Sequence, residues 1–137
     1  MPQVKITKSQ GLIQSSGRGF IIQQPFALGQ QSKTAGTTQT QAGATEIDAN
    51  FPLVLVTNAN ASDGVKLPPL SEVPQGTMYW IYNTHATNTL ELYPNTDDAL
   101  AAGSDNAGYT IAGDAFAICV ALNGARWAVA EPAAAGA

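Results

Sequence analysis

The alternation of apolar and polar positions is clearest over residues 115–130. Two alternating runs flank Asn123-Gly124, and Asn-Gly between such runs is a strong signal for a tight type I′ hairpin. In that register Val120 faces Trp127, and all the large side chains share one face. That face would hold Phe116, Ile118, Val120, Leu122, Trp127 and Val129. The opposite, small-residue face predicts another layer or another subunit packed closely against it.

Upstream of this hairpin, short apolar runs begin at residue 45 and recur between turn residues. Residues 53–57 form a nearly continuous apolar run, which is typical of a strand buried on both faces. Residues 77–83 form the most aromatic strand, and residues 98–102 predict a single helical turn. About eight short strands at this spacing indicate an all-β protein, an antiparallel β-sandwich of jelly-roll type.

The first 44 residues have a different character. Val4 and Ile6 alternate with polar residues and predict a short strand, whereas residues 27–45 contain almost nothing to bury. A structureless loop of that length is improbable inside a compact domain, so we favour a segment that lies extended on a partner over a flexible one. We therefore divide the chain into an extended basic arm with short strands (1–44), a β-sandwich core domain (45–130) and a flexible tail (131–137).

Charge supports the same division. Only 12% of residues are charged, against roughly 25% in a typical globular domain. Residues 1–33 contain four cations and no acid, whereas residues 34–137 contain two cations and ten acids. A basic arm on an acidic body can dock on a neighbouring copy or on another acidic surface, although an ordinary solvated strand remains the alternative. The four candidate contact residues are Lys5, Lys8, Arg18 and Lys33.

Several partners and locations are disfavoured by the same composition. Four cations spread over 33 residues do not form a nucleic-acid patch. No apolar run approaches the roughly 18 residues of a membrane span, and the first residues lack the apolar core of a signal peptide. We expect a chain that is made in the cytoplasm and either stays there or leaves as part of a larger particle.

Candidate chemistry is sparse. His85 lies in a Thr/Asn-rich loop, and Cys119 lies mid-strand, where a buried, inert thiol is expected. One histidine and one cysteine do not supply a zinc ligand set, and no serine motif or phosphate-binding glycine loop is present. Loop carboxylates could hold Ca²⁺, although their spacing does not match an EF-hand, and solvated turn acids are the simpler interpretation. These acids are Asp97, Asp98, Asp105 and Asp114. We predict a non-enzyme without catalytic, cofactor-binding or metal-binding residues.

The aromatic residues are concentrated. Alternation places Trp80 and Tyr82 on one side of their strand, opposite Tyr79 and Ile81. One set belongs to the core, and the other fits a subunit interface or a sugar-binding platform. Our candidate core or interface residues are Trp80, Tyr82, Phe116, Ile118, Val120 and Trp127.

Residues 63–127 together form a recognisable series of turns and strand ends. It comprises Asp-Gly-Val-Lys-Leu-Pro (63–68), Tyr-Asn (82–83), Asn-Thr-Leu-Glu-Leu-Tyr-Pro (88–94), Asp-Ala (98–99), Phe-Ala-Ile-Cys-Val (116–120) and Asn-Gly-Ala-Arg-Trp (123–127). This series resembles small β-rich virion proteins of tailed bacteriophages, in particular capsid decoration (head cement) proteins. These motifs are structural, so the resemblance carries over no catalytic residue.

The resemblance implies a homotrimer on the outer capsid surface, where it binds the major capsid protein, bridges neighbouring capsomers and stabilises the head. An N-terminal arm commonly contacts the capsid in such proteins, and the basic segment 1–44 suits that role. The alternatives are a tail- or fibre-associated module of the same phage class and, behind it, a carbohydrate-binding β-sandwich with an exposed Tyr79/Tyr93 side. An enzyme comes last.

Overall fold

The computed structural model describes residues 4–8, 11–14, 16–17 and 23–131. Strands dominate this part of the chain, and a short 3₁₀ helix, η1, interrupts them. In chain order the elements are β1 (Val4–Thr7), β2 (Gly11–Gln14), β3 (Gln30–Thr34), β4 (Thr45–Glu46), β5 (Leu53–Thr57), β6 (Asp63–Lys66), η1 (Leu70–Glu72), β7 (Met78–Asn83), β8 (Leu90–Tyr93), β9 (Ala99–Leu100), β10 (Tyr109–Ile111), β11 (Phe116–Asn123) and β12 (Arg126–Ala130). The all-β prediction is confirmed.

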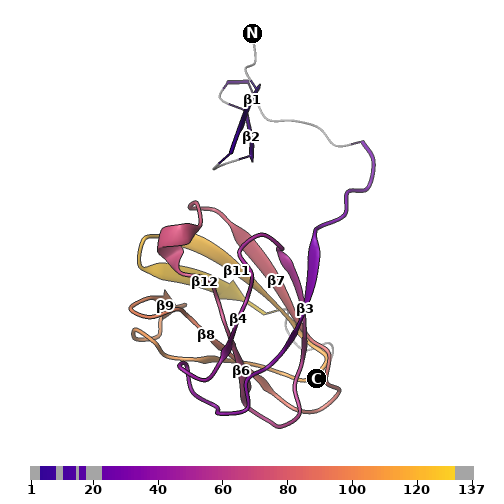
Figure 1. The fold of residues 1–137 in the computed structure, drawn as a ribbon, viewed down its shortest axis with the longest axis vertical. Coiled ribbons are helices and arrows are strands. Elements are labelled where there is room, and N and C mark those ends of the chain that lie inside the picture. Colours follow the sequence, from indigo (N-terminus) through magenta and orange to yellow (C-terminus); the bar gives the residue numbers. More distant parts are fainter. Residues whose placement is uncertain (1–3, 9–10, 15, 18–22, 132–137) are drawn as a thin grey trace.

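Two sheets build the body of the molecule (Figure 1). The six-stranded sheet has the order β3-β5-β7-β11-β12-β9, and the four-stranded sheet has the order β10-β8-β6-β4. From β3 to β8 the chain enters the two sheets alternately, so that β3, β5 and β7 pair in parallel in one sheet and β4, β6 and β8 in the other. The far sheet thus supplies the crossover that parallel neighbours require.

This winding corrects the predicted fold. The sheets are mixed rather than antiparallel, since antiparallel pairing within them is confined to β7–β11, β11–β12 and β8–β10. The arrangement of β3 to β8 is β-solenoid-like. Sequence alternation reports which face a residue occupies but not the direction of the neighbouring strand, so the pattern left the parallel pairing undetected.

The core is one cluster to which both sheets contribute. Trp127 of β12 is fully buried and packs edge-on against Tyr79 of β7, with ring centroids 5.7 Å apart. Leu90 and Leu92 of β8, from the opposite sheet, belong to the same cluster. A core shared in this way holds the two sheets together through apolar burial.

Part of the predicted arm belongs to the body. β3 is the edge strand of the six-stranded sheet and pairs with β5 along its whole length. Gly36 and Gly64 then exchange backbone hydrogen bonds of 2.8 and 2.9 Å. A Cβ atom on Gly64 would lie 2.9 Å from the ring of Tyr93, so glycine is required there for close packing. Residues 30–44 are thus integrated, although we assigned them to the arm.

The hairpin prediction holds for β11 and β12, but its register and turn were wrong. Ala121 pairs with Trp127, and the register shifts between Ala121 and Asn123, leaving Leu122 as the extra residue of a bulge. Asn123 and Gly124 do not adopt the positive φ of a type I′ turn. Instead Asn123 Oδ1 accepts the backbone N–H of Ala125 at 3.0 Å, an Asx turn.

The predicted helical turn at residues 98–102 is also absent. Ala99 and Leu100 form β9, which pairs in parallel with β12. Asp98 Oδ2 accepts the backbone N–H of Leu70 at 3.0 Å and so anchors η1. Strand pairing at the sheet edge has overridden the helix propensity of the alanines.

Candidate binding surface

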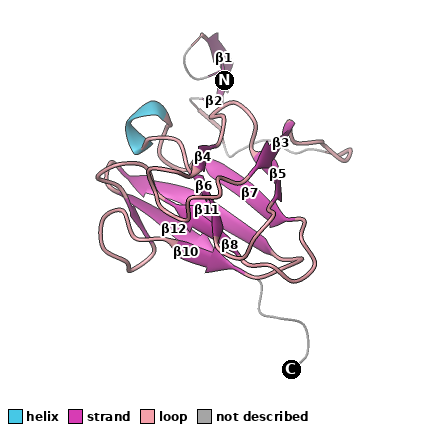
Figure 2. Ribbon diagram, turned by 60° about the horizontal axis from the view of Figure 1, so that its bottom comes forward, coloured by secondary structure: helices cyan, strands magenta, loops and turns pink. Residues whose placement is uncertain are grey.

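The surface of the six-stranded sheet that faces away from the core is built from apolar rows. Trp80 pairs with Leu53 on one side and with Ile118 on the other, and Ile118 pairs with Ala130. One adjacent row joins Leu55, Tyr82 and Phe116, and the other joins Met78, Val120 and Ala128. We call this set the outer face: Leu53, Leu55, Met78, Trp80, Tyr82, Phe116, Ile118, Val120, Ala128 and Ala130. Figure 2 shows β7, β11 and β12 side by side in this sheet.

Large side chains on the outer face are open to solvent. Met78 is 47% exposed, Phe116 37% and Trp80 36%, while Ile118 and Val120 are half-buried. Tyr82 and Phe116 contact each other with ring centroids 4.7 Å apart. Contiguous exposed apolar side chains of this kind mark interaction sites.

None of the residues of the outer face is charged. At its border the Tyr82 hydroxyl donates to Asp114, and this hydrogen bond raises the pKa of Tyr82. Arg126 is turned to the sheet edge, where its guanidinium donates to the backbone carbonyls of Ala101 and Gly103. The charged side chains nearest in sequence to the outer face thus lie around it, which matches the polar rim of a protein interface.

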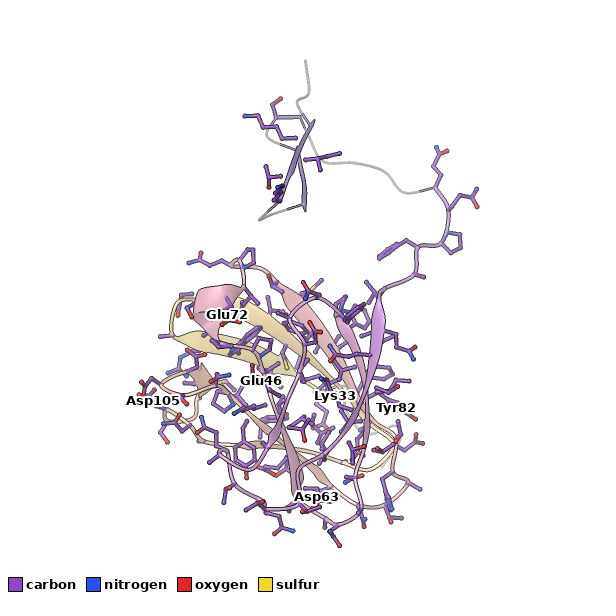
Figure 3. All side chains as sticks on the ribbon, viewed as in Figure 1. Lys33, Glu46, Asp63, Glu72, Tyr82 and Asp105 are labelled. Atoms are coloured by element: carbon purple, nitrogen blue, oxygen red, sulfur yellow. The ribbon has the colours of Figure 1, made fainter. Side chains whose placement is uncertain are left out.

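The outward surface of the four-stranded sheet is different. Lys66 and Glu46 form an ion pair of 3.7 Å there, and Thr110 donates to Glu91 at 2.8 Å. In Figure 3, Glu46 of the four-stranded sheet and Tyr82 of the outer face are labelled at separate places on the body. The exposed apolar side chains of the body therefore belong to one sheet, while the other sheet has an ordinary wet surface.

Five of the six predicted core or interface residues are brought together. Trp80, Tyr82, Phe116, Ile118 and Val120 lie on the outer face, whereas Trp127 lies in the core. The predicted hairpin register had put Trp127 on the same face as the large β11 side chains. The small face of β11 is the one that packs on the second sheet, as Ala117, Cys119 and Ala121 are all buried.

The basic candidates are not gathered at one place. Lys5 lies on β1 and Lys8 follows it, both exposed, and Arg18 lies outside the described residues. Lys33 is half-buried on β3. The pKa of nearby Asp48 is lowered mainly by hydrogen bonds from Asn50 and only last by the charge of Lys33. Lys33 thus belongs to the body and not to an arm.

The carbohydrate-binding alternative loses the aromatic pair on which it was based. Tyr79 is fully buried, donates to the carbonyl of Ala49 at 2.8 Å and has a pKa raised by burial to about 12. Tyr93 lies in the other sheet, so the pair forms no sugar-binding platform. Among the described residues, no group of three or more histidine, cysteine or acidic side chains is placed to hold a metal ion.

The remaining chemistry-bearing residues have local structural partners. His85 Nδ1 accepts the backbone N–H groups of Thr87 and Asn88 at 3.2 and 2.8 Å and so closes its own loop. Cys119 is buried, and desolvation raises the pKa of its thiol to about 12. A thiol held in the neutral form in this way is a poor nucleophile.

Sequence reasoning missed Leu53 and Leu55 as parts of the outer face. The apolar run 53–57 predicts a strand buried on both sides, but only Val54 and Val56 face the core. The alternation of β7 did group Met78 with Trp80. The parallel pairing of β5 with β7, which extends the face by two leucines, left no signal in the pattern.

Comparisons of the chain with family models, curated proteins and solved structures found no match. Within the residues that the structure describes, no helix has the length and apolar character needed to cross a membrane.

Proposed function

We propose that this protein is a non-enzymatic structural subunit of a virion, of the capsid decoration type. It self-associates as a trimer, binds the major capsid protein on the outer surface of the head and bridges neighbouring capsomers. The observation that carries the proposal is the outer face, an uncharged apolar sheet surface that suits assembly better than catalysis.

Two further features support this proposal. The motifs of residues 63–127 resemble those of phage decoration proteins, and the all-β body agrees with the small β-rich proteins of that resemblance. Lys5 and Lys8 are exposed on a hairpin that lies apart from the body in Figure 1. We assign capsid contact to this basic hairpin, β1–β2, and self-association to the body.

Charge reversal on the hairpin tests the proposal. We expect the double variant Lys5→Glu and Lys8→Glu to lose co-sedimentation with capsids while its mass in solution stays that of the wild type. High salt should weaken capsid binding of the wild type in the same way, because exposed charges are screened at ionic strengths near 1 M, where the Debye length is about 3 Å. The readouts are co-sedimentation with purified capsids and light scattering coupled to size exclusion.

Lys66→Gln is the control, since it removes one half-buried cation of the body and should keep capsid binding. A wild-type protein that does not sediment with capsids would contradict the proposed function. Undiminished sedimentation of the double variant would contradict the role of the hairpin.

A further inference from the structure

Exposed large apolar side chains occur at three separate places in the described chain. Met78, Trp80 and Phe116 belong to the outer face, with Leu122 and Phe51 also exposed on the same sheet or just before it. The others are Phe26, 67% exposed, and Ile6 on the hairpin. An apolar surface and an apolar side chain on an extended segment are complementary features.

Residues 23–29, Gln-Gln-Pro-Phe-Ala-Leu-Gly, form the segment that carries Phe26, and we call it the linker. It contains no charge, in contrast to the basic residues before it. It enters the body at Gly29, whose carbonyl accepts the backbone N–H of Leu53 at 3.1 Å. The linker therefore joins the sheet beside the outer face, yet it leads away from its own body in Figure 1.

We propose that the linker of one copy packs on the outer face of a second copy, with Phe26 seated against Trp80. This inference deepens the self-association part of the proposed function and rests on it. The neutral linker matches the uncharged face, so the contact desolvates no unpaired charge. Burial of Phe26 and of the exposed outer-face side chains supplies the free energy.

The pairing of two different surfaces also fits a closed assembly. A face that packs on itself gives a two-fold dimer, whereas a linker on a neighbour's face is a heterologous contact, which can close into a ring. Each copy then both donates a linker and accepts one, so a trimer would contain three such contacts and leave no outer face uncovered.

Cysteine pairing between distinguishable chains tests this contact. The natural Cys119 is buried and is first replaced by alanine, which leaves no other cysteine in the sequence. One chain then carries Phe26→Cys and a second, size-tagged chain carries Trp80→Cys. After mixing under mild oxidation, we expect the mixed covalent dimer of the two chains, in large excess over either symmetric dimer, on non-reducing gels.

Each other outcome overturns the inference. A covalent dimer from the Trp80→Cys chain alone shows that outer faces pack on each other. A single chain carrying both cysteines that cross-links only within itself shows that the linker folds back onto its own body. An oligomer by light scattering without any cross-link shows that other surfaces hold the copies together. The control chain carries Thr110→Cys on the opposite sheet in place of Trp80→Cys. If the Phe26→Cys chain cross-links equally strongly to this control, the outer face is not its specific partner.

The proposed function and the linker contact can fail separately. Capsid co-sedimentation of the unmodified protein reports on the proposed function. The mixed cross-link is measured on the free protein and reports on the linker contact alone. The mass of the free, unmodified protein by light scattering gives the number of copies in the assembly.

Discussion

Trp127 shows how a single residue organises the core. Its indole ring is fully buried against Tyr79, but within the described structure the indole Nε1–H has no hydrogen-bond acceptor. Its contribution to stability is therefore one of volume and apolar area, because an unpaired buried donor opposes folding.

Two substitutions at Trp127 separate these effects. We expect Trp127→Ala to lower the free energy of unfolding by about 3–5 kcal/mol, since it leaves a large cavity in the core. Trp127→Phe should cost clearly less, because the indole N–H that it removes makes no hydrogen bond. Urea unfolding of the three proteins measures both values, and equal losses for the two variants would show that the N–H has a partner.

The side chains of β11 show why the outer face was only partly predictable from the sequence. Alternation separated Phe116, Ile118 and Val120 correctly from Ala117 and Cys119. It could not decide which set faces the core, so the large side chains remained candidates for core or interface. The opposite sheet already brings Leu90, Leu92 and Ile111 into the interior, so that close packing leaves room only for small side chains on β11.

At the scale of elements, the β11–β12 turn is the sharpest difference between expectation and structure. Asn-Gly predicted a type I′ turn, which requires positive φ at both central residues. The observed turn uses the Asn123 side chain as an acceptor, and a bulge at Leu122 shifts the register so that Trp127 turns inward. One extra residue thus moved a tryptophan from one face of the sheet to the other.

Gly124→Ala tests this turn. No atom lies within 4 Å of a Cβ placed on Gly124, and its φ is not positive, so we expect unchanged or slightly higher stability, by up to about 1 kcal/mol. Gly64→Ala is the matched control and should destabilise, because its Cβ would meet the Tyr93 ring. Thermal unfolding measures both. A clear loss at Gly124 would favour the type I′ turn.

The positions of most strands after residue 45 were readable from the sequence, but β9 and the order in which the strands pair were not. Turn residues and short apolar runs mark β5 to β8 and β10 to β12. β3, by contrast, has the polar sequence Gln-Gln-Ser-Lys-Thr and lies at a sheet edge, where little apolar surface is needed. Its strand state depends on backbone pairing with β5, which a hydrophobic pattern does not record.

At the scale of the whole molecule, the shared core couples stability to alkaline pH. Cys119 and its neighbour Tyr79 on β7 both have pKa values raised by burial, from 9.0 and 10.0 to about 12. Above pH 9 the unfolded chain releases protons that the native protein retains. The stability contributed by the neutral groups is therefore complete below pH 9 and is lost as the pH rises toward 12.

We expect the midpoint of urea unfolding to fall between pH 9 and pH 12. Cys119→Ala should reduce this fall, mainly in its lower part, because the thiol has the lower ordinary pKa, 9.0 against 10.0 for tyrosine, while Tyr79 and Tyr82 still contribute. Unfolding series at pH 8, 10 and 11 for both proteins would measure the effect. An identical slope in the two proteins would mean that the thiol ionises equally well in the folded chain.

The parallel pairing of β3 with β5 has a mechanical consequence. The linker continues directly into β3, so tension on it acts along the strand, and the hydrogen bonds from the Gln30/Leu53 pair to the Thr34/Thr57 pair lie across that direction. Loaded in shear, these bonds bear the force together, whereas a hairpin pulled apart at its open end would lose them one at a time. Under the proposed function, a pull on the capsid-bound hairpin would therefore load this pairing in shear.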